Sequence, residues 1–342
     1  MTSVLLTGAT GYIGSHTWVA LHEAGFRVVG LDNFSNSSPQ VLRRLERLTG
    51  SALSFEQADV TDQAAVASAL TRHRIAAVVH FAALKAVGES TAQPLDYYRN
   101  NIGGLVSLCR AMQSAACQHL VFSSSATVYG KPDSLPIRED APVQATNPYG
   151  QTKRMGEQIL HDLGRADPAW RTGILRYFNP VGAHESGLIG EDPRGVPNNL
   201  MPYVAQVAVG RREKLHVFGN DYQTSDGTGV RDYIHVMDLA QGHVAALQAM
   251  LAGGDSFTVN LGTGQGYSVL ELVRAYEVAS GRPIPYEVVA RRPGDIDACY
   301  ADPTRAHDLL GWRAQHGLQR MCQDSWHWQR LNPQGFESSE PA

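Results

Sequence analysis

The chain has 342 residues, of which 43% are hydrophobic and 18% are charged. This composition supports a large core and excludes a disordered chain. The 29 Lys and Arg residues against 33 Asp and Glu give a net charge of −4, which argues against a general binder of nucleic acid or acidic membranes. A negatively charged ligand would therefore have to be held by a few well-placed cations.

In the first half of the chain, short apolar runs alternate with helical patterns. Helices are predicted at 62–70 and 101–116, and strands at 4–6, 27–31, 76–81, 120–123 and 173–176. Continuous apolar strands separated by helices are typical of a parallel sheet covered on both faces. We therefore expect residues 1–180 to form a doubly wound, Rossmann-type α/β domain.

After residue 180 the pattern changes, because residues 181–230 are rich in Gly, Pro and Asn. The elements predicted beyond this point are helices near 200–210 and 269–279, a strand at 257–261, and a helix from Asp302-Pro303 to about Gly311. We expect a smaller, loop-rich α/β region over residues 181–332, partly interleaved with the first. Residues 333–342 are expected to form a flexible tail.

Signals for export, membrane insertion and metal binding are absent from the sequence. The N-terminus lacks a basic segment, and no apolar stretch approaches the roughly 20 residues that a membrane helix needs. Four cysteines form no CxxC pair and no zinc-like spacing: Cys109, Cys117, Cys299 and Cys322. We expect buried thiols in a reducing compartment, and so a soluble cytoplasmic protein with no metal site.

A glycine-rich turn follows the first predicted strand. Gly8, Gly11 and Gly14 form a GxxGxxG pattern, in which missing side chains let the backbone approach a pyrophosphate at a helix N-terminus. Asp32 closes the second strand, where a carboxylate accepts both ribose hydroxyls and repels a 2′-phosphate. The pattern predicts NAD rather than NADP, with Asp59-Val60 placed for an adenine contact. The alternative interpretation is three turn glycines and an N-capping Asp.

Tyr149 and Lys153 form a YxxxK pattern directly after Asn147-Pro148, a good helix start. Their side chains are therefore expected one turn apart on one helix face. A tyrosine, with a pKa of about 10, is a poor base at neutral pH, but a neighbouring ammonium and a positive nicotinamide ring would lower that pKa. On its own, such a pair is more often a solvated helix face.

Three consecutive serines, Ser123–Ser125, precede this pair at the end of a predicted strand. Ligands of such sheets bind outside the carboxyl ends of the strands, so a serine hydroxyl there is placed to hydrogen-bond a substrate hydroxyl. The alternative is a simple strand-to-loop turn. The glycine turn, the serines and the YxxxK pair are hard to obtain in this order by accident.

These three elements resemble the extended short-chain dehydrogenase/reductases. More closely, residues 3–335 resemble the UDP-glucose 4-epimerases, also called UDP-galactose 4-epimerases. The closer resemblance is carried by the stretches 7–8, 11–17, 31–33, 80–90, 176–184, 197–202 and 226–236. It implies an isomerase of galactose metabolism that interconverts UDP-glucose and UDP-galactose with tightly bound NAD.

The resemblance also implies a mechanism. Tyr149 would remove the proton from the sugar 4-hydroxyl while hydride passes from C4 to NAD, and Ser125 would share the proton network. Lys153 would bind the nicotinamide ribose and tune Tyr149. The 4-ketosugar would then turn over and take the hydride back on its other face.

Site residues are carried over from the family position by position. The cofactor set is Gly8, Gly11, Tyr12, Ile13, Gly14, Asp32, Asn33, Asn36, Ser37, Asp59, Val60, Phe81, Ala82, Ala83, Lys85, Asn100, Ser125, Tyr149, Lys153 and Phe178. The substrate set is Asn179, Asn199, Leu200, Phe218, Arg231, Arg292, Asp295 and Cys299. Within it, Arg231 and Arg292 suit the diphosphate, because guanidinium binds phosphate oxygens in pairs. Without the motif, two such arginines would be read as solvated loop residues.

Two alternative functions remain at this point. A nucleotide-sugar 4,6-dehydratase also begins by oxidising C4, but such enzymes carry an acidic pair where this chain has Ala126-Thr127. A non-catalytic NAD-binding regulator would typically lack a complete YxxxK pattern. Both alternatives are disfavoured by these residues.

Two finer expectations follow from the resemblance. Cys299 stands where some family members carry tyrosine, and members with a small residue there accept N-acetylated sugars; we therefore expect activity on UDP-GlcNAc and UDP-GalNAc as well. The alternative is a packing cysteine without a role in selectivity. A homodimer joined through helices near 101–116 and 149–163 is also expected.

Overall fold

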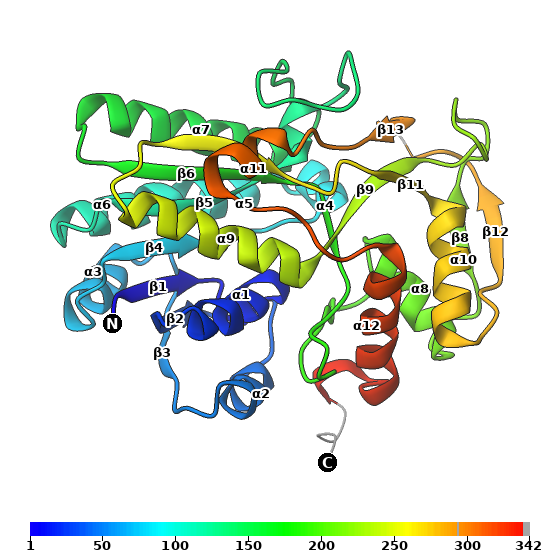
Figure 1. Ribbon diagram of the computed structural model, residues 1–342, viewed down its shortest axis with the longest axis horizontal. Coiled ribbons are helices and arrows are strands. Elements are labelled where there is room, and N and C mark those ends of the chain that lie inside the picture. The colour runs from blue at the N-terminus through cyan, green and yellow to red at the C-terminus, as the bar shows by residue number, and fades with distance from the viewer. Residues whose placement is uncertain (293, 338–342) are drawn as a thin grey trace.

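The computed structural model describes residues 1–292 and 294–337, and its largest element is a seven-stranded parallel sheet (Figure 1). The strands lie in the order β10-β6-β5-β4-β1-β2-β3. Their bounds are β1 Ser3–Thr7, β2 Arg27–Asp32, β3 Ser54–Gln57, β4 Ala77–His80, β5 His119–Ser125, β6 Arg171–Tyr177 and β10 Phe257–Leu261. The predicted doubly wound α/β fold is confirmed. Strand order reverses between β1 and β4, the place where such sheets bind ligands.

Helices cover both faces of this sheet. On one face lie α1 Tyr12–Glu23, α2 Gln40–Thr49, α9 Val236–Leu251 and α11 Thr304–Leu310. On the other face lie α3 Gln63–Arg72, α6 Gly104–Ser114 and α7 Pro148–Ala166. Shorter elements complete this half: α4 Val87–Ala92, α5 Pro94–Tyr97, the π-helical turn η1 Tyr98–Gly103 and the 3-10 turn η2 Ala126–Tyr129.

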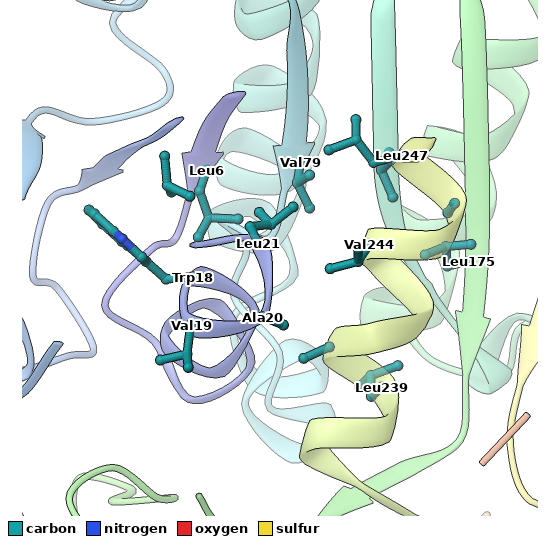
Figure 2. Close-up of a cluster of buried hydrophobic side chains, with 14 of the residues drawn as sticks. Leu6, Trp18, Val19, Ala20, Leu21, Val79, Leu175, Leu239, Val244 and Leu247 are labelled. Carbon is teal, nitrogen blue, oxygen red and sulfur yellow. The ribbon is translucent and has the colours of Figure 1, made fainter. Parts of the chain in front are cut away.

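The two-residue period of the strands divides the core between these faces. Val4 and Leu6 of β1 belong to the cluster under α1 and α9, whereas Leu5 belongs to the cluster under α3, α6 and α7. Figure 2 shows side chains of this first cluster, with Leu6 and Val79 near Leu21 of α1 and Leu175 beside α9. Because both faces are buried, the central strands β1 and β4 carry apolar side chains toward both sides.

The smaller region is built on two further sheets. Their strands are β7 Asn179–Val181, β8 Leu215–Phe218, β9 Val230–His235, β11 Gly266–Ser268, β12 Tyr286–Val289 and β13 Ala298–Cys299. Strand β9 pairs with β7, β11 and β13, while β8 pairs with β12. Helices α8 Leu200–Ala208, α10 Val269–Ser280 and α12 Leu318–Leu331 pack around them. Between β9 and β11 the chain returns to the large sheet as α9 and β10. The division into domains at residue 180 stays a prediction.

The first part of the segment expected to form a flexible tail from residue 333 packs against the rest of the protein. Gly335–Glu337 forms the 3-10 turn η3, and the Phe336 ring is buried with its centroid 4.8 Å from that of Trp328. The Arg44 guanidinium lies over both rings, 4.9 Å from the Phe336 centroid and 5.3 Å from that of Trp328. This stacking holds the segment, and residues 338–342 lie outside the described residues. No helix within the described ranges is long and apolar enough to cross a membrane.

Candidate active site

The glycine turn lies at the carboxyl end of β1, where the chain enters α1. A Cβ at Gly14 would lie 2.1 Å from the Gly8 carbonyl oxygen, and a Cβ at Gly8, which has φ +67°, would lie 2.8 Å from the Ala82 nitrogen. Glycine is therefore required where α1 meets the sheet. The N-terminus of α1 has no side-chain cap and no acidic residue in its first turn, which suits a diphosphate.

Asp32 is the last residue of β2, and the loop that follows wraps around its carboxylate. Its oxygens accept hydrogen bonds from the Thr10 nitrogen at 3.0 Å, the Phe34 nitrogen at 2.9 Å and the Ser37 hydroxyl at 3.2 Å. Nearby, the Asn33 amide donates to Asp59 at 2.8 Å. The structure therefore places Ser37 on the Asp32 carboxylate and joins Asn33, the next residue, to Asp59.

Other members of the predicted cofactor set surround this core of the site. Val60 is buried directly after Asp59, and Asn36 is exposed in the loop. The Tyr12 hydroxyl donates to the Gly182 carbonyl at 2.8 Å, which links the first turn of α1 to the smaller region. Ile13 is half-buried beside it and packs against the core under α1 and α9.

The segment after β4 lies directly against the glycine turn. Phe81, Ala82 and Ala83 follow the strand, and the Asn101 carboxamide oxygen accepts from the Leu84 nitrogen at 2.8 Å and from Asn100 at 2.9 Å. Lys85 is half exposed, with its Nζ 3.6 Å from the Glu191 carboxylate. Lys85 is therefore paired with a carboxylate of the segment that leads to α8, and its contact with a cofactor phosphate stays a prediction.

The YxxxK pair lies in the first two turns of α7. Asn147 caps this helix, accepting from the Gly150 nitrogen at 2.8 Å, and Pro148 is its first residue, as the sequence predicted. The Lys153 ammonium donates to the Ser123 carbonyl at 2.6 Å and to the Ser123 hydroxyl at 3.1 Å. Its Nζ lies 5.9 Å from the centroid of the Tyr149 ring, so the two side chains share one face of the helix.

Burial shifts both members of this pair toward their neutral forms. It raises the pKa of Tyr149 to about 12, while a hydrogen bond with Ser125 acts in the opposite direction. It lowers the pKa of Lys153 to about 7, against the attraction of the Glu157 carboxylate. In the protein alone, burial outweighs the lowering of the tyrosine pKa that we expected from the ammonium. That lowering of the Tyr149 pKa would have to come from the positive nicotinamide ring of a bound NAD.

A buried network missed by the sequence analysis holds the serine strand in place. The Ser124 hydroxyl donates to Glu157 at 2.5 Å, and Arg176 clamps the same carboxylate at 2.9 and 2.6 Å. Arg176 also donates to the Tyr129 hydroxyl at 3.0 Å. The only signal in the sequence is that Glu157 lies four residues after Lys153. Thus Ser123 anchors Lys153, Ser124 anchors the strand, and Ser125 faces Tyr149.

Two predicted diphosphate ligands share one carboxylate in the smaller region. Arg292 donates to Asp295 at 3.0 Å, and an Arg231 guanidinium nitrogen lies 3.7 Å from the other Asp295 oxygen. Arg231 also donates to the Ile296 carbonyl at 3.0 Å, while the Arg292 guanidinium lies 4.7 Å from the centroid of the Phe218 ring. Both guanidinium groups are thus held in place by acceptors of the protein, and the exposed Phe218 ring lies next to Arg292.

Phe178 of the predicted cofactor set and the remaining predicted substrate residues lie where the two regions meet. Phe178 is buried at the end of β6, and Asn179 is exposed at the start of β7. Asn199 precedes α8, which begins at Leu200, and its amide donates to Glu191 at 2.8 Å. Cys299 is half-buried on β13, paired in register with Arg231. Within the described ranges, no three His, Cys, Asp or Glu side chains are grouped to hold a metal.

Comparisons with known proteins agree with this geometry. A family model described as GDP-mannose 4,6 dehydratase matches residues 5–325. The UDP-glucose 4-epimerase of Bacillus subtilis (strain 168) is 59% identical over 338 residues, covering 99% of this chain and 100% of that protein. The chain belongs to the UDP-glucose 4-epimerase family. The predicted family is confirmed.

Solved epimerase structures show the same architecture. The enzyme from Stenotrophomonas maltophila, with bound NAD and formylated UDP-arabinopyranose, has a TM-score of 0.95 at 53% identity and covers 96% of this chain and 98% of its own. The Bifidobacterium longum enzyme, in complex with NAD+ and UDP, has a TM-score of 0.93 at 52% identity and covers 98% and 100%. The likeness to these epimerases, at more than half of all positions, extends over both regions of the fold.

Proposed function

We propose that this chain interconverts UDP-glucose and UDP-galactose by transient oxidation at sugar C4, with NAD held throughout the cycle. The observation that carries the proposal is the convergence of Ser125, Tyr149 and Lys153 at the carboxyl ends of the central strands. They lie next to the glycine turn and Asp32, which fit a dinucleotide. The full-length likeness to UDP-glucose 4-epimerases supports the same reaction.

The protein's own groups handle the proton of the sugar 4-hydroxyl. The Tyr149 phenolate accepts this proton and later returns it, while Ser125 hydrogen-bonds the same oxygen network. The Lys153 ammonium, fixed on Ser123, favours the phenolate by its charge. NAD, when bound by the glycine turn and Asp32, supplies a site that accepts hydride from C4 and gives it back.

The substrate's diphosphate is assigned to the arginine pair of the smaller region. Arg231 and Arg292 are both held by Asp295, so their guanidinium groups are oriented before substrate arrives. At a net charge of −4 there is no general positive field to assist them. With the nucleotide gripped in this way, the ketosugar is free to turn and present its other face.

The direct test uses the purified protein and UDP-galactose without added NAD. The expected result is conversion to UDP-glucose, together with NAD released from the protein on denaturation. A 4,6-dehydratase would instead produce a 4-keto-6-deoxy sugar; positions 126 and 127, where an acidic pair would be needed, hold Ala and Thr. No conversion, or a need for stoichiometric NAD, would overturn the proposal.

We further propose that the pocket accepts UDP-GlcNAc and UDP-GalNAc. Cys299 is a small side chain on β13, beside Arg231 of the arginine pair, so it leaves room that a tyrosine would fill. Cys299→Tyr should remove activity on the N-acetylated sugars and spare UDP-galactose, while Cys299→Ser, with a similarly small side chain, should retain both. Equal losses on both substrates in the tyrosine variant would contradict this selectivity role.

A homodimer is proposed through α6 and α7. Val106 on α6 and Met155 on α7 are exposed apolar residues, 38% and 42% accessible, on the two helices that the family resemblance indicated. Light scattering should give twice the chain mass for the wild type and a monomer for Val106→Glu/Met155→Glu. Val278→Glu is the control, because Val278 is an exposed apolar residue, 75% accessible, on α10 rather than on the proposed interface. A monomeric wild type would exclude the dimer.

A cytoplasmic location is proposed on the state of the cysteines. All four are free thiols, and Cys109, Cys117 and Cys322 are buried. Free buried thiols are typical of a reducing compartment. Fractionation of cells, with detection by antibody, is the measurement; recovery outside the cytoplasm would contradict the proposal.

A further inference from the structure

An arginine from the smaller region holds the loop that carries the adenosine-side residues of the cofactor site. The Arg194 guanidinium donates to the carbonyl oxygens of Ser35 at 2.8 Å, Ser37 at 2.7 Å and Phe34 at 3.3 Å. Three carbonyls of one short loop therefore converge on one planar, five-donor group. No motif of the family resemblance contains this arginine, and the reaction described above gives it no role.

The loop held by Arg194 contains a residue in an unusual backbone conformation and contacts the cofactor carboxylate. Phe34 has φ +57°, a left-handed conformation that bulky side chains rarely adopt. The same loop donates two of the hydrogen bonds that orient the Asp32 carboxylate, from the Phe34 nitrogen and the Ser37 hydroxyl. The Ser37 hydroxyl also lies 2.7 Å from that of Thr10 in the glycine turn. Order in this loop therefore sets the geometry of the cofactor carboxylate.

The segment that carries Arg194 is anchored independently of the loop. Glu191 accepts from Asn199 at 2.8 Å and lies 3.6 Å from Lys85, and its carbonyl accepts from the Trp328 indole at 3.3 Å. The Asp192 carboxylate accepts from the Phe336 nitrogen at 2.8 Å. In Figure 1 this green segment, which leads to α8, descends between α2 and α12. Loss of the Arg194 side chain therefore leaves the segment itself in place.

We propose that Arg194 is a positioning residue for the dinucleotide, which slows its release by fixing the Phe34–Ser37 loop around Asp32. The inference rests on the proposed function, because it requires NAD to be the resident cofactor. Arg194 contacts neither the reacting atoms nor Asp32 itself; it acts through the three carbonyls. Its guanidinium is exposed and bonded to neutral oxygens, so the effect is one of hydrogen-bond geometry rather than of charge.

The experiment follows NAD retention by the full-length protein. Wild type, Arg194→Ala, Arg194→Lys and Arg43→Ala are loaded with NAD and transferred to NAD-free buffer, and the NAD that remains bound is measured over time. Arg43 is the matched control, since it is an exposed arginine on α2, near the same loop, and makes no hydrogen bond or ion pair among the described residues. Thermal unfolding of each variant reports whether it has folded.

Arg194→Ala should lose NAD about tenfold faster than wild type. The hydrogen bonds that it removes from the loop are expected to change the dissociation constant of NAD by about a factor of ten. Its epimerase activity should decay in parallel and return when NAD is added. Arg194→Lys keeps the positive charge but lacks the planar guanidinium group, and it is the variant less disruptive to folding. Its rate of NAD loss should lie between those of wild type and Arg194→Ala. Equal retention by wild type and both Arg194 variants would overturn the inference. Failure of wild type to hold NAD would instead overturn the proposed function.

Discussion

Burial acts in opposite directions on the two ionisable side chains of the YxxxK pair. It moves the pKa of Tyr149 up to about 12 and that of Lys153 down to about 7, so each group is pushed toward its uncharged form. A neutral phenol cannot accept a proton. The site therefore depends on positive charge near the phenol, from Lys153 and from the nicotinamide ring, to make the tyrosine a base.

Tyr149→Phe removes the proton acceptor and keeps the aromatic ring in its place. We expect kcat to fall about 10²- to 10⁴-fold, the usual contribution of a positioned acid or base, with KM changed much less. Steady-state rates with UDP-galactose are the measurement. Tyr286→Phe is the control, because Tyr286 is exposed on β12 and distant from the YxxxK pair in the fold. A variant within threefold of wild type would rule out Tyr149 as the acceptor.

Gly14→Ala tests the steric requirement at the start of α1. The new Cβ would lie 2.1 Å from the Gly8 carbonyl oxygen, a backbone atom that cannot move without shifting the glycine turn. We expect loss of bound NAD, measured on the purified protein, together with a lower unfolding temperature. Gly164→Ala on α7 is the matched control, since a Cβ there meets nothing within 4 Å. Helix propensity should make that control slightly more stable. Equal NAD content in both variants would contradict the argument.

At the scale of secondary structure, the end of β5 is held by α7 and β6 together. Ser124, Glu157 and Arg176 are each at most 5% exposed, and they join the three elements through one carboxylate. The flanking serines, Ser123 and Ser125, face Lys153 and Tyr149. A shift of this strand end would therefore change both contacts at once.

Glu157→Gln keeps the shape of this link but leaves the buried Arg176 charge without a counter-charge. We expect the free energy of unfolding to fall by about 3–5 kcal/mol, the usual effect of breaking a buried ion pair on one side. Denaturant titration measures it. The double variant Glu157→Met/Arg176→Met, which removes both charges, should recover most of the loss. A double variant less stable than Glu157→Gln would show that the charge is not the cause.

Local patterns predicted most strands of the large sheet, because strands such as β1, β2 and β4 are buried on both faces and read as continuous apolar runs. The more exposed β3, Ser54–Gln57, was not predicted. The predicted strand at 257–261 coincides with β10, although its partner β6 lies some eighty residues earlier. Helix α9 was not predicted, because it is buried on most sides and shows no clear apolar face. Strands β8 and β12 were missed as well; each has four residues and pairs with a strand far along the chain.

The residues of the candidate site also fall into those that a local pattern reveals and those that depend on distant partners. Residues in short motifs, such as Gly14, Asp32 and the YxxxK pair, could be proposed from the order of those motifs along the chain and from the family resemblance. Glu157 and Arg194 could not, since their roles depend on partners that are distant in sequence or unremarkable in type. Arg194, for example, lies about 160 positions from the loop that it holds.

At the scale of the whole molecule, buried histidines on both sides of the large sheet link its stability to pH. Burial lowers the pKa of His80 and His16 to about 3 and that of His243 to about 4. His243 is fully buried, with its ring centroid 4.7 Å from that of Phe81 and 5.4 Å from that of Tyr177. In the unfolded chain each would titrate near its ordinary value of about 6.5.

The folded-state pKa of these histidines is therefore below the unfolded value, and their contribution to stability is complete above pH 6.5. As the pH falls below 6.5, the unfolded chain binds protons at these histidines and the folded protein does not. The free energy of unfolding therefore decreases. At pH 5 the loss should reach about 2 kcal/mol for each histidine, and it should continue toward pH 4. Denaturant titrations between pH 7.5 and 5 would measure the slope.

His243→Phe removes one of these protons while keeping an aromatic ring among Phe81 and Tyr177. Its free energy of unfolding should fall less steeply below pH 6.5, by about 1.4 kcal/mol per pH unit, because one fewer proton separates the two states. His161→Gln is the control: His161 is exposed on α7, and its replacement should leave the slope of the wild type unchanged. If His243→Phe and the wild type gave parallel curves, proton uptake by buried histidines would not be what destabilises the fold in acid.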